Sequence, residues 1–196
     1  MRILDNLLCE KAFRYIQEFF LHKLPWNYLD HCASRGNETE DKENFQFTHT
    51  FCSAKDAYLE RATKREHSSV IKPILYKLHP WLLLRVKANL RTKTPEHVRS
   101  ALHTDLREIG QLTAIYYLNT CDGYTMFQDG TKVSSVENRL LIFDGNDLHC
   151  GTSPTDSKVR MVLNINYFPE DTKDGAKYMP DESVCGQPTK WNAIKF

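Results

Sequence analysis

The stretch that decides the fold class is residues 139–168, which read RLLIFDGNDLHCGTSPTDSKVRMVLNINYF. It holds three short runs of apolar or alternating residues, at 139–143, 148–152 and 159–168. The turn-forming sequence DGND separates the first two runs, because Asp, Asn and Gly favour tight turns. In the last run apolar and polar residues alternate, as in a β-strand with two different faces. These features predict three strands in close succession.

The same pattern extends toward the N-terminus. Asp129-Gly130, between two strand-like runs, predicts a β-hairpin turn. Eight short strands within about ninety residues are typical of a jelly roll or a similar two-sheet barrel. The five further runs are 81–90, 101–106, 112–119, 124–127 and 131–136.

The N-terminal part has helical periodicity instead. Apolar residues recur at helical spacing over 6–22, where Asp5 can cap the helix, and again over 67–78. Between these two helices we expect a strand at 44–52 and a short helix at 53–61. The strand-rich part would therefore rest on helices that precede it.

Length and composition fit a single domain. The chain has 196 residues, of which 41% are hydrophobic and 11% aromatic, enough to bury a sizeable core. We expect residues 1–80 to form helical support, residues 81–168 to form the strand-rich body, and residues 169–196 to form a polar C-terminal tail. Tail residues Trp191 and Phe196 are candidates for docking on the body.

Charge and cysteine content bound the function. The formal net charge is +1, with 26 basic and 25 acidic residues interspersed, so nothing indicates a nucleic-acid partner. Six cysteines without a CxxC pair indicate reduced thiols in a cytoplasm. The N-terminal apolar residues are broken by charges, and no stretch has the roughly 20 apolar residues of a membrane span. We expect a soluble cytoplasmic protein without a membrane partner, and the oligomeric state stays open.

The candidate chemistry lies in the strand-rich part. His103 and Asp105 are two positions apart, which places both side chains on one face of a strand. A second imidazole, His149, follows the DGND turn. Two histidines and one carboxylate on one side of an iron leave coordination positions open for catalysis.

The run 158–167 adds polar groups to a barrel interior. Its alternation places Arg160, Asn164 and Asn166 on one face with Val162. Such groups are costly to bury unpaired, so we expect an anionic ligand inside the barrel.

These residues resemble the prolyl-4-hydroxylase-like branch of the 2-oxoglutarate/Fe(II) dioxygenases. Within that branch, the sequence is most similar to short forms carried by bacteriophages of cyanobacteria. The resemblance covers roughly residues 80–168 and implies a double-stranded β-helix of the cupin-like, jelly-roll type. It rests on the order and spacing of His103-Thr104-Asp105, residues 114–119, 123–127 and 138–143, His149 and Arg160.

The resemblance also implies residue roles. His103, Asp105 and His149 would bind Fe(II). Arg160, where many prolyl hydroxylases have Lys, would hold the distal carboxylate of 2-oxoglutarate through its bidentate guanidinium. The hydroxyl of Tyr117 would donate to the same carboxylate.

Two amides would complete the co-substrate site. Asn164, like Asn166 on the same face, would face the metal-bound end of 2-oxoglutarate. Asn89 occupies a position where the animal hydroxylases tend to have Tyr, so its role departs from the family pattern.

The reaction implied by the resemblance is hydroxylation of a C–H bond. It needs Fe(II), 2-oxoglutarate and O₂, with ascorbate as a reductant, and it releases succinate and CO₂. Asp105 favours hydroxylation, since related halogenases have a small residue there. By analogy the substrate is a prolyl residue of a protein or peptide, while a free amino acid, small metabolite or nucleobase stays open. If the chain is phage-encoded, it would act in the host cytoplasm.

Simpler readings stay open beside these. Arg160 could form a salt bridge on the outside of the barrel, Tyr117 could be a core residue, and Asn89 and Asn164 could be satisfied amides. The basic segment 87–99 could be a substrate lid or a solvated loop. The alternative function is a cupin-like metal-binding or sensing module without oxygenase activity. An anion clamp together with a complete metal triad favours the enzyme.

Overall fold

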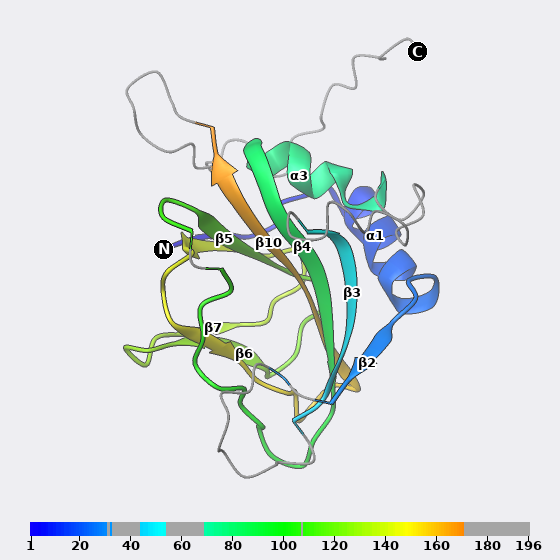
Figure 1. Ribbon diagram of the computed structural model, residues 1–196. Helices are drawn as coiled ribbons and strands as arrows, with labels where there is room; N and C mark the ends of the chain where they lie inside the picture. The colour runs from blue at the N-terminus through cyan, green and yellow to red at the C-terminus, as the bar shows by residue number, and fades with distance from the viewer. Residues whose placement is uncertain (31, 33–43, 54–68, 107, 171–196) are drawn as a thin grey trace.

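Ten strands in two antiparallel sheets form the body of the protein, as the computed structural model shows for the residues it describes, 1–30, 32, 44–53, 69–106 and 108–170 (Figure 1). The larger sheet has the strand order β1-β8-β5-β10-β4-β3-β2, and the smaller has the order β7-β6-β9. Within the described residues there are two α-helices. The elements are β1 (Arg2–Leu4), α1 (Glu10–His22), β2 (Asn27–Leu29), β3 (Gln46–Ser53), α3 (Lys72–Leu78), β4 (Pro80–Thr92), β5 (Leu112–Tyr117), β6 (Tyr124–Phe127), β7 (Lys132–Ser134), β8 (Leu140–Asp144), β9 (His149–Gly151) and β10 (Val159–Pro169).

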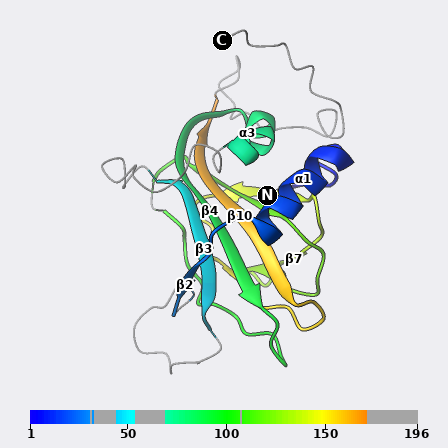
Figure 2. The ribbon, with the colours of Figure 1, turned by 90° about the vertical axis from the view of Figure 1, so that its right-hand side faces the viewer.

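The alternation in β10 separates two environments. Met161, Leu163, Ile165 and Tyr167 belong to the main apolar core, which also contains the buried faces of α1 and α3. The helices therefore cover one face of the large sheet (Figures 1 and 2). The other face of β10 carries polar residues and lies toward the small sheet, where Val162 joins a second, smaller apolar cluster. The sequence alternation thus fixes which face of the large sheet is left for a binding site.

The prediction of a mainly β, double-stranded β-helix fold with supporting helices is confirmed. Seven of the eight predicted strand runs correspond to β4 through β10. The Asp129-Gly130 hairpin joins β6 to β7, with Gly130 at a φ of 88° that suits glycine.

The strand predicted at 101–106 is wrong. His103 makes only an isolated antiparallel bridge to His149, through two backbone hydrogen bonds of 3.0 Å. The neighbouring strand β9 has only three residues, so it offers too short an edge to pair with the whole run.

Two N-terminal predictions need correction. The helix expected over 6–22 begins at Glu10, and its N-cap is Cys9. Asp5 does not cap it but pairs with Arg139, at 2.6 Å between Oδ1 and Nε. The strand expected at 44–52 is seen as β3, but the N-terminal part is less helical than expected because it also supplies β1 and β2 to the large sheet.

The remaining predictions fall partly outside the described residues. The helix expected over 67–78 is seen as α3 with helical residues 69 and 70 before it. The short helix expected at 53–61 and almost all of the 169–196 tail lie outside the described residues. Every described cysteine is free. No helix of the described part is long and apolar enough to cross a membrane.

Candidate metal centre and co-substrate site

The structure brings His103, Asp105 and His149 together between the two sheets. Their candidate ligand atoms all lie within 4.8 Å of one another. The Asp105 carboxylate lies between the rings, with Oδ1 3.7 Å from His103 Nε2 and Oδ2 3.9 Å from His149 Nε2. Three ligands on one side of a common centre suit a divalent transition metal with open positions.

Backbone carbonyls orient both imidazoles. His103 Nδ1 lies 2.9 Å from the carbonyl oxygen of Ala101, and His149 Nδ1 lies 3.0 Å from that of Asp147. A proton on each Nδ1 would donate to these carbonyls, leaving Nε2 with a free lone pair toward the metal position. Burial lowers the pKa of His149, although Asp105 opposes the change. The chemistry of this donor set fits Fe(II).

Three side chains from two neighbouring strands hold the Asp105 carboxylate. Arg85 of β4 forms an ion pair of 2.7 Å with Oδ1, while Asn164 and Asn166 of β10 donate to Oδ2 at 2.7 and 3.1 Å. Burial raises the pKa of Asp105, but Arg85, His149 and Asn166 together outweigh it and lower the pKa to about 2. The carboxylate is therefore ionised and fixed before any metal binds.

Arg160 lies at the start of β10, within the same cavity wall. Its Nε donates to the Ser135 hydroxyl at 2.6 Å, and its Nη2 donates to the Thr125 hydroxyl at 3.1 Å. Burial lowers the pKa of Arg160, since the charged guanidinium loses hydration. Its hydrogen-bond partners among the described residues are neutral hydroxyls, which do not compensate the charge. A buried guanidinium held only by hydroxyls is a suitable receptor for a carboxylate.

Tyr117 lies beside this guanidinium. The Arg160 carbon Cζ is 5.7 Å from the centre of the Tyr117 ring, and the Tyr117 hydroxyl donates to Thr125 at 2.9 Å. Burial raises the pKa of Tyr117, so the phenol stays a neutral donor.

Two glycines make room for Arg160. A Cβ atom added to Gly123 would lie 2.7 Å from Arg160 Cδ, and one added to Gly151 would lie 3.2 Å from Arg160 Nη1. Glycine at both positions lets the guanidinium reach the cavity interior.

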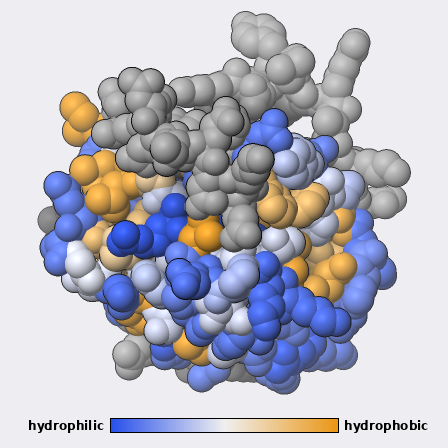
Figure 3. All heavy atoms as spheres, turned by 90° about the horizontal axis from the view of Figure 1, so that it is seen from below, coloured by the Kyte–Doolittle hydropathy of each residue, from blue (hydrophilic) through white to orange (hydrophobic). Residues whose placement is uncertain are grey.

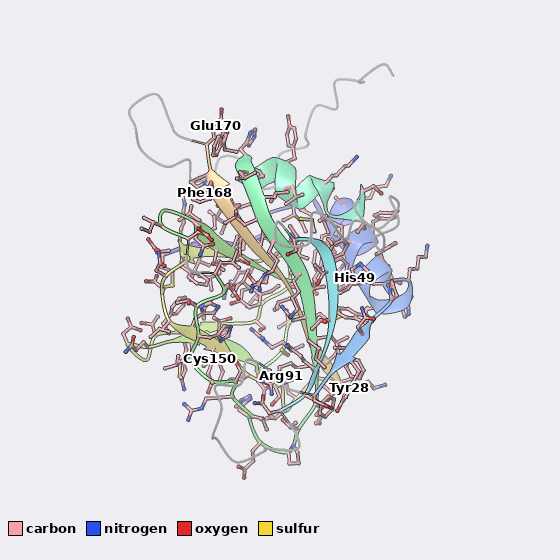
Figure 4. The ribbon with its side chains drawn as sticks, in the orientation of Figure 1. Tyr28, His49, Arg91, Cys150, Phe168 and Glu170 are labelled. Atoms are coloured by element: carbon pink, nitrogen blue, oxygen red, sulfur yellow. The ribbon has the colours of Figure 1, made fainter. Side chains whose placement is uncertain are left out.

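One cavity of about 280 Å³ connects the metal cluster with Arg160. Its walls include β4 side chains that point inward with alternating period: Arg85, Lys87, Asn89 and Arg91. Arg91 lies directly opposite Arg160 in the β4–β10 register and donates to the Gly151 carbonyl at 3.2 Å and to Asn44 at 3.1 Å. Arg91 lies toward the end of the sheet away from Phe168 and Glu170 (Figure 4).

Every candidate site residue from the sequence analysis lies at this cavity or against it. Asn89 lines it opposite Val162, and Tyr117 lies beneath Arg160. The amide nitrogen of Asn164 contacts Asp105 instead of facing open space. The segment 87–99 is no simple loop, because Lys87 and Arg91 belong to β4 and line the cavity.

The sequence analysis missed the residues that line the cavity or bond Asp105 and Arg160. Arg85, Lys87 and Arg91 were not recognised as interior, although polar and small or apolar residues alternate strictly over 85–91. That alternation is the signal that could have identified them. Thr125 and Ser135 carry no recognisable sequence signal.

Among the described residues there is no second group of three possible metal ligands. The end of the molecule seen from below is covered mainly by hydrophilic residues, with small separate hydrophobic patches (Figure 3).

Comparison with known proteins gives the fold. No protein-family model matches the chain, and no curated protein sequence matches it. A prolyl hydroxylase from Trichoplax adhaerens, solved with a hypoxia inducible factor oxygen degradation domain peptide, is similar in structure with a TM-score of 0.53 and 13% identity, covering 85% of this chain and 82% of that one.

Two further solved structures are similar to the same degree. AviO1 from Streptomyces viridochromogenes Tue57 has a TM-score of 0.52 and 11% identity, over 88% of this chain and 90% of its own. SnoN, a non-heme alpha ketoglutarate dependent epimerase from nogalamycin biosynthesis, has a TM-score of 0.51 and 14% identity, over 91% and 86%. At these identities the likeness establishes the fold, and function must be argued from the site.

Proposed function

We propose that the protein is a 2-oxoglutarate-dependent Fe(II) oxygenase that hydroxylates a C–H bond. The observation that carries the proposal is that one cavity contains both a two-histidine, one-carboxylate cluster and a buried arginine held by neutral partners. A module that only binds metal has no need of the arginine. The fold shared with a prolyl hydroxylase and with a non-heme alpha ketoglutarate dependent epimerase supports the same cofactor chemistry.

His103, Asp105 and His149 would hold the iron. When bound there with 2-oxoglutarate and O₂, the iron supplies an oxidation that converts the co-substrate to succinate and CO₂ and inserts one oxygen atom into a substrate C–H bond. Arg85, Asn164 and Asn166 keep the Asp105 carboxylate ionised and oriented, so that it need not reorganise when the metal enters.

Arg160 and Tyr117 would position the co-substrate. The guanidinium would hold the distal carboxylate, with Tyr117 and Thr125 as neighbouring hydroxyls. Ile115 and Val162 line the same cavity, and Phe143 of the same apolar cluster packs against His149, so these side chains limit water access. A prolyl residue of a protein or peptide is one substrate for this reaction, with ascorbate as reductant.

The test needs no knowledge of the substrate. Apo protein is mixed without oxygen with Fe(II) and 2-oxoglutarate, and the weak visible metal-to-ligand charge-transfer band is recorded. We expect a band in the wild type and in His22→Ala, which alters an exposed histidine of α1, and no band in His103→Ala. On admission of O₂, succinate should form in the two proteins with the band.

The alternative function predicts a different result. If metal analysis shows bound iron but saturating 2-oxoglutarate gives no band, the oxygenase proposal is wrong. The cupin-like metal-binding or sensing module would then be favoured.

A further inference from the structure

The described lining of the cavity, on β4 and β10, carries more positive charge than the proposed cofactors can neutralise. Among the described residues, four basic side chains line the cavity, Arg85, Lys87, Arg91 and Arg160, against the one carboxylate of Asp105. Fe(II) would bring two positive charges and 2-oxoglutarate two negative charges, which cancel. The excess of basic groups therefore persists in the loaded site.

Lys87 is the member of this set that lacks a hydrogen-bond or ion-pair partner among the described residues. Arg85 is paired with Asp105, and Arg160 is assigned to the distal carboxylate of 2-oxoglutarate. Within the part of the chain that the structure describes, the Lys87 ammonium has neither a hydrogen-bond acceptor nor an ion-pair partner. Lysine is seldom buried without a partner, because the ammonium loses hydration.

The position of Lys87 relates it to the reacting centre. Lys87 lies directly opposite Asn164 in the β4–β10 register, and Asn164 donates to the Asp105 carboxylate. Residues opposite each other in adjacent strands have Cβ atoms about 5 Å apart. The half-buried Lys87 side chain thus lies next to the metal cluster, one strand further toward β3 than Asn164.

We propose that the substrate is a small molecule bearing an anionic group, a carboxylate or a phosphate, that forms an ion pair with Lys87 beside the metal. This inference rests on the proposed oxygenase function and assigns the substrate class for that site. The cavity of about 280 Å³ lies at the small end for ligand pockets and must also hold 2-oxoglutarate. A compact acid fits these limits better than an uncharged interior segment of a protein chain.

The experiment measures binding and does not depend on turnover. Protein loaded with Fe(II) and 2-oxoglutarate is titrated without oxygen, and a shift of the charge-transfer band reports a second ligand near the metal. One set of probes is free α-amino acids, including L-proline, each compared with its amide. The other set is phosphate monoesters, each compared with the corresponding alcohol.

Lys87→Met removes the charge and keeps most of the side-chain length. Lys93→Met is the matched control, because Lys93 is an exposed lysine just beyond the same strand. Lys87→Gln is a second variant, in case the first does not fold, and thermal unfolding reports the fold of each.

We expect at least one acid or phosphate to shift the band while its neutral counterpart does not, and the set to which it belongs identifies the anion. Its Kd should rise at least about tenfold in Lys87→Met, as for loss of one partly buried ion pair, and stay unchanged in Lys93→Met. The Kd of 2-oxoglutarate should change less than about threefold.

Three results would overturn the inference: no probe that binds, equal binding of charged and neutral probes, or a Lys87→Met effect mainly on 2-oxoglutarate, which would assign Lys87 to the co-substrate. In each case an intact charge-transfer band leaves the proposed function standing. Loss of the band in the wild type would instead refute the oxygenase itself.

Discussion

Replacing Arg160 by Met should weaken co-substrate binding and, in the same protein, stabilise the apo form. Arg160 is 5% exposed, and its described hydrogen bonds go to the hydroxyls of Ser135 and Thr125. Without a bound anion, its charge therefore carries an uncompensated desolvation cost, in keeping with its lowered pKa. Methionine fills a similar length with no charge.

The two effects have separate magnitudes. Loss of two charge-assisted hydrogen bonds to a carboxylate costs about 3 kcal/mol, which raises the Kd of 2-oxoglutarate about 100-fold. Removal of an unpaired buried charge should raise the free energy of unfolding of the apo protein by about 1 kcal/mol. A residue that only supports the fold would lower stability when truncated.

Anaerobic titration of the charge-transfer band gives the Kd, and urea unfolding with a metal chelator present gives the stability. Arg91→Met is the matched control, because Arg91 lies opposite Arg160 and is equally buried at 5% exposure. We expect its effect on the Kd to stay below about tenfold. If Arg160→Met binds 2-oxoglutarate as tightly as the wild type, or Arg91→Met shows the larger loss, the assignment of the clamp is refuted.

Two further predictions concern stability. Asn138→Ala should lower the free energy of unfolding, measured in urea, by about 4 kcal/mol. Asn138 has a φ of 60°, and its side-chain amide forms hydrogen bonds with the backbone N–H and carbonyl of Leu8 and with the Tyr116 hydroxyl. A loss below about 1 kcal/mol would contradict this. Asp105 has a folded pKa of about 2 against an ordinary value near 4. Its contribution to the stability of the apo protein is therefore present above about pH 4 and is progressively lost below it, by about 1 kcal/mol at pH 3. Urea unfolding of wild type and Asp105→Asn at pH 6 and pH 3 isolates this contribution, and an equal pH loss in both proteins would show that Arg85 does not hold the carboxylate ionised.

The strand-rich part was predictable because its signals are local. Alternation over 159–168 fixes the two faces of β10, and the DGND and Asp129-Gly130 turns fix where neighbouring strands end. The grouping of His103, Asp105 and His149 in one place was expected from the two-residue spacing of His103 and Asp105 and from the resemblance to a known family.

The parts that failed depend on tertiary context. The three residues of β1 carry no period, and only pairing with β8 makes them a strand. The run 101–106 has the strand pattern but lacks a partner edge beyond His149. The alternation over 85–91 could have placed Lys87 on an inner face, but which residues lie beside it depends on β4 lying between β3 and β10, which no local pattern reveals.

The failed strand at 101–106 changes how the metal site must be understood. A carboxylate carried by a strand would be aimed by ladder hydrogen bonds, but Asp105 lies beyond the single bridge at His103. Its aim comes from Arg85 on β4 and from Asn164 and Asn166 on β10, and these two strands pair along their full length. The position of the Asp105 carboxylate is therefore fixed by side chains of the rigid sheet. The backbone around Asp105 needs little regular structure of its own. The same two strands carry Lys87 and Arg160, so one rigid element would set the distances among metal, co-substrate and substrate charge.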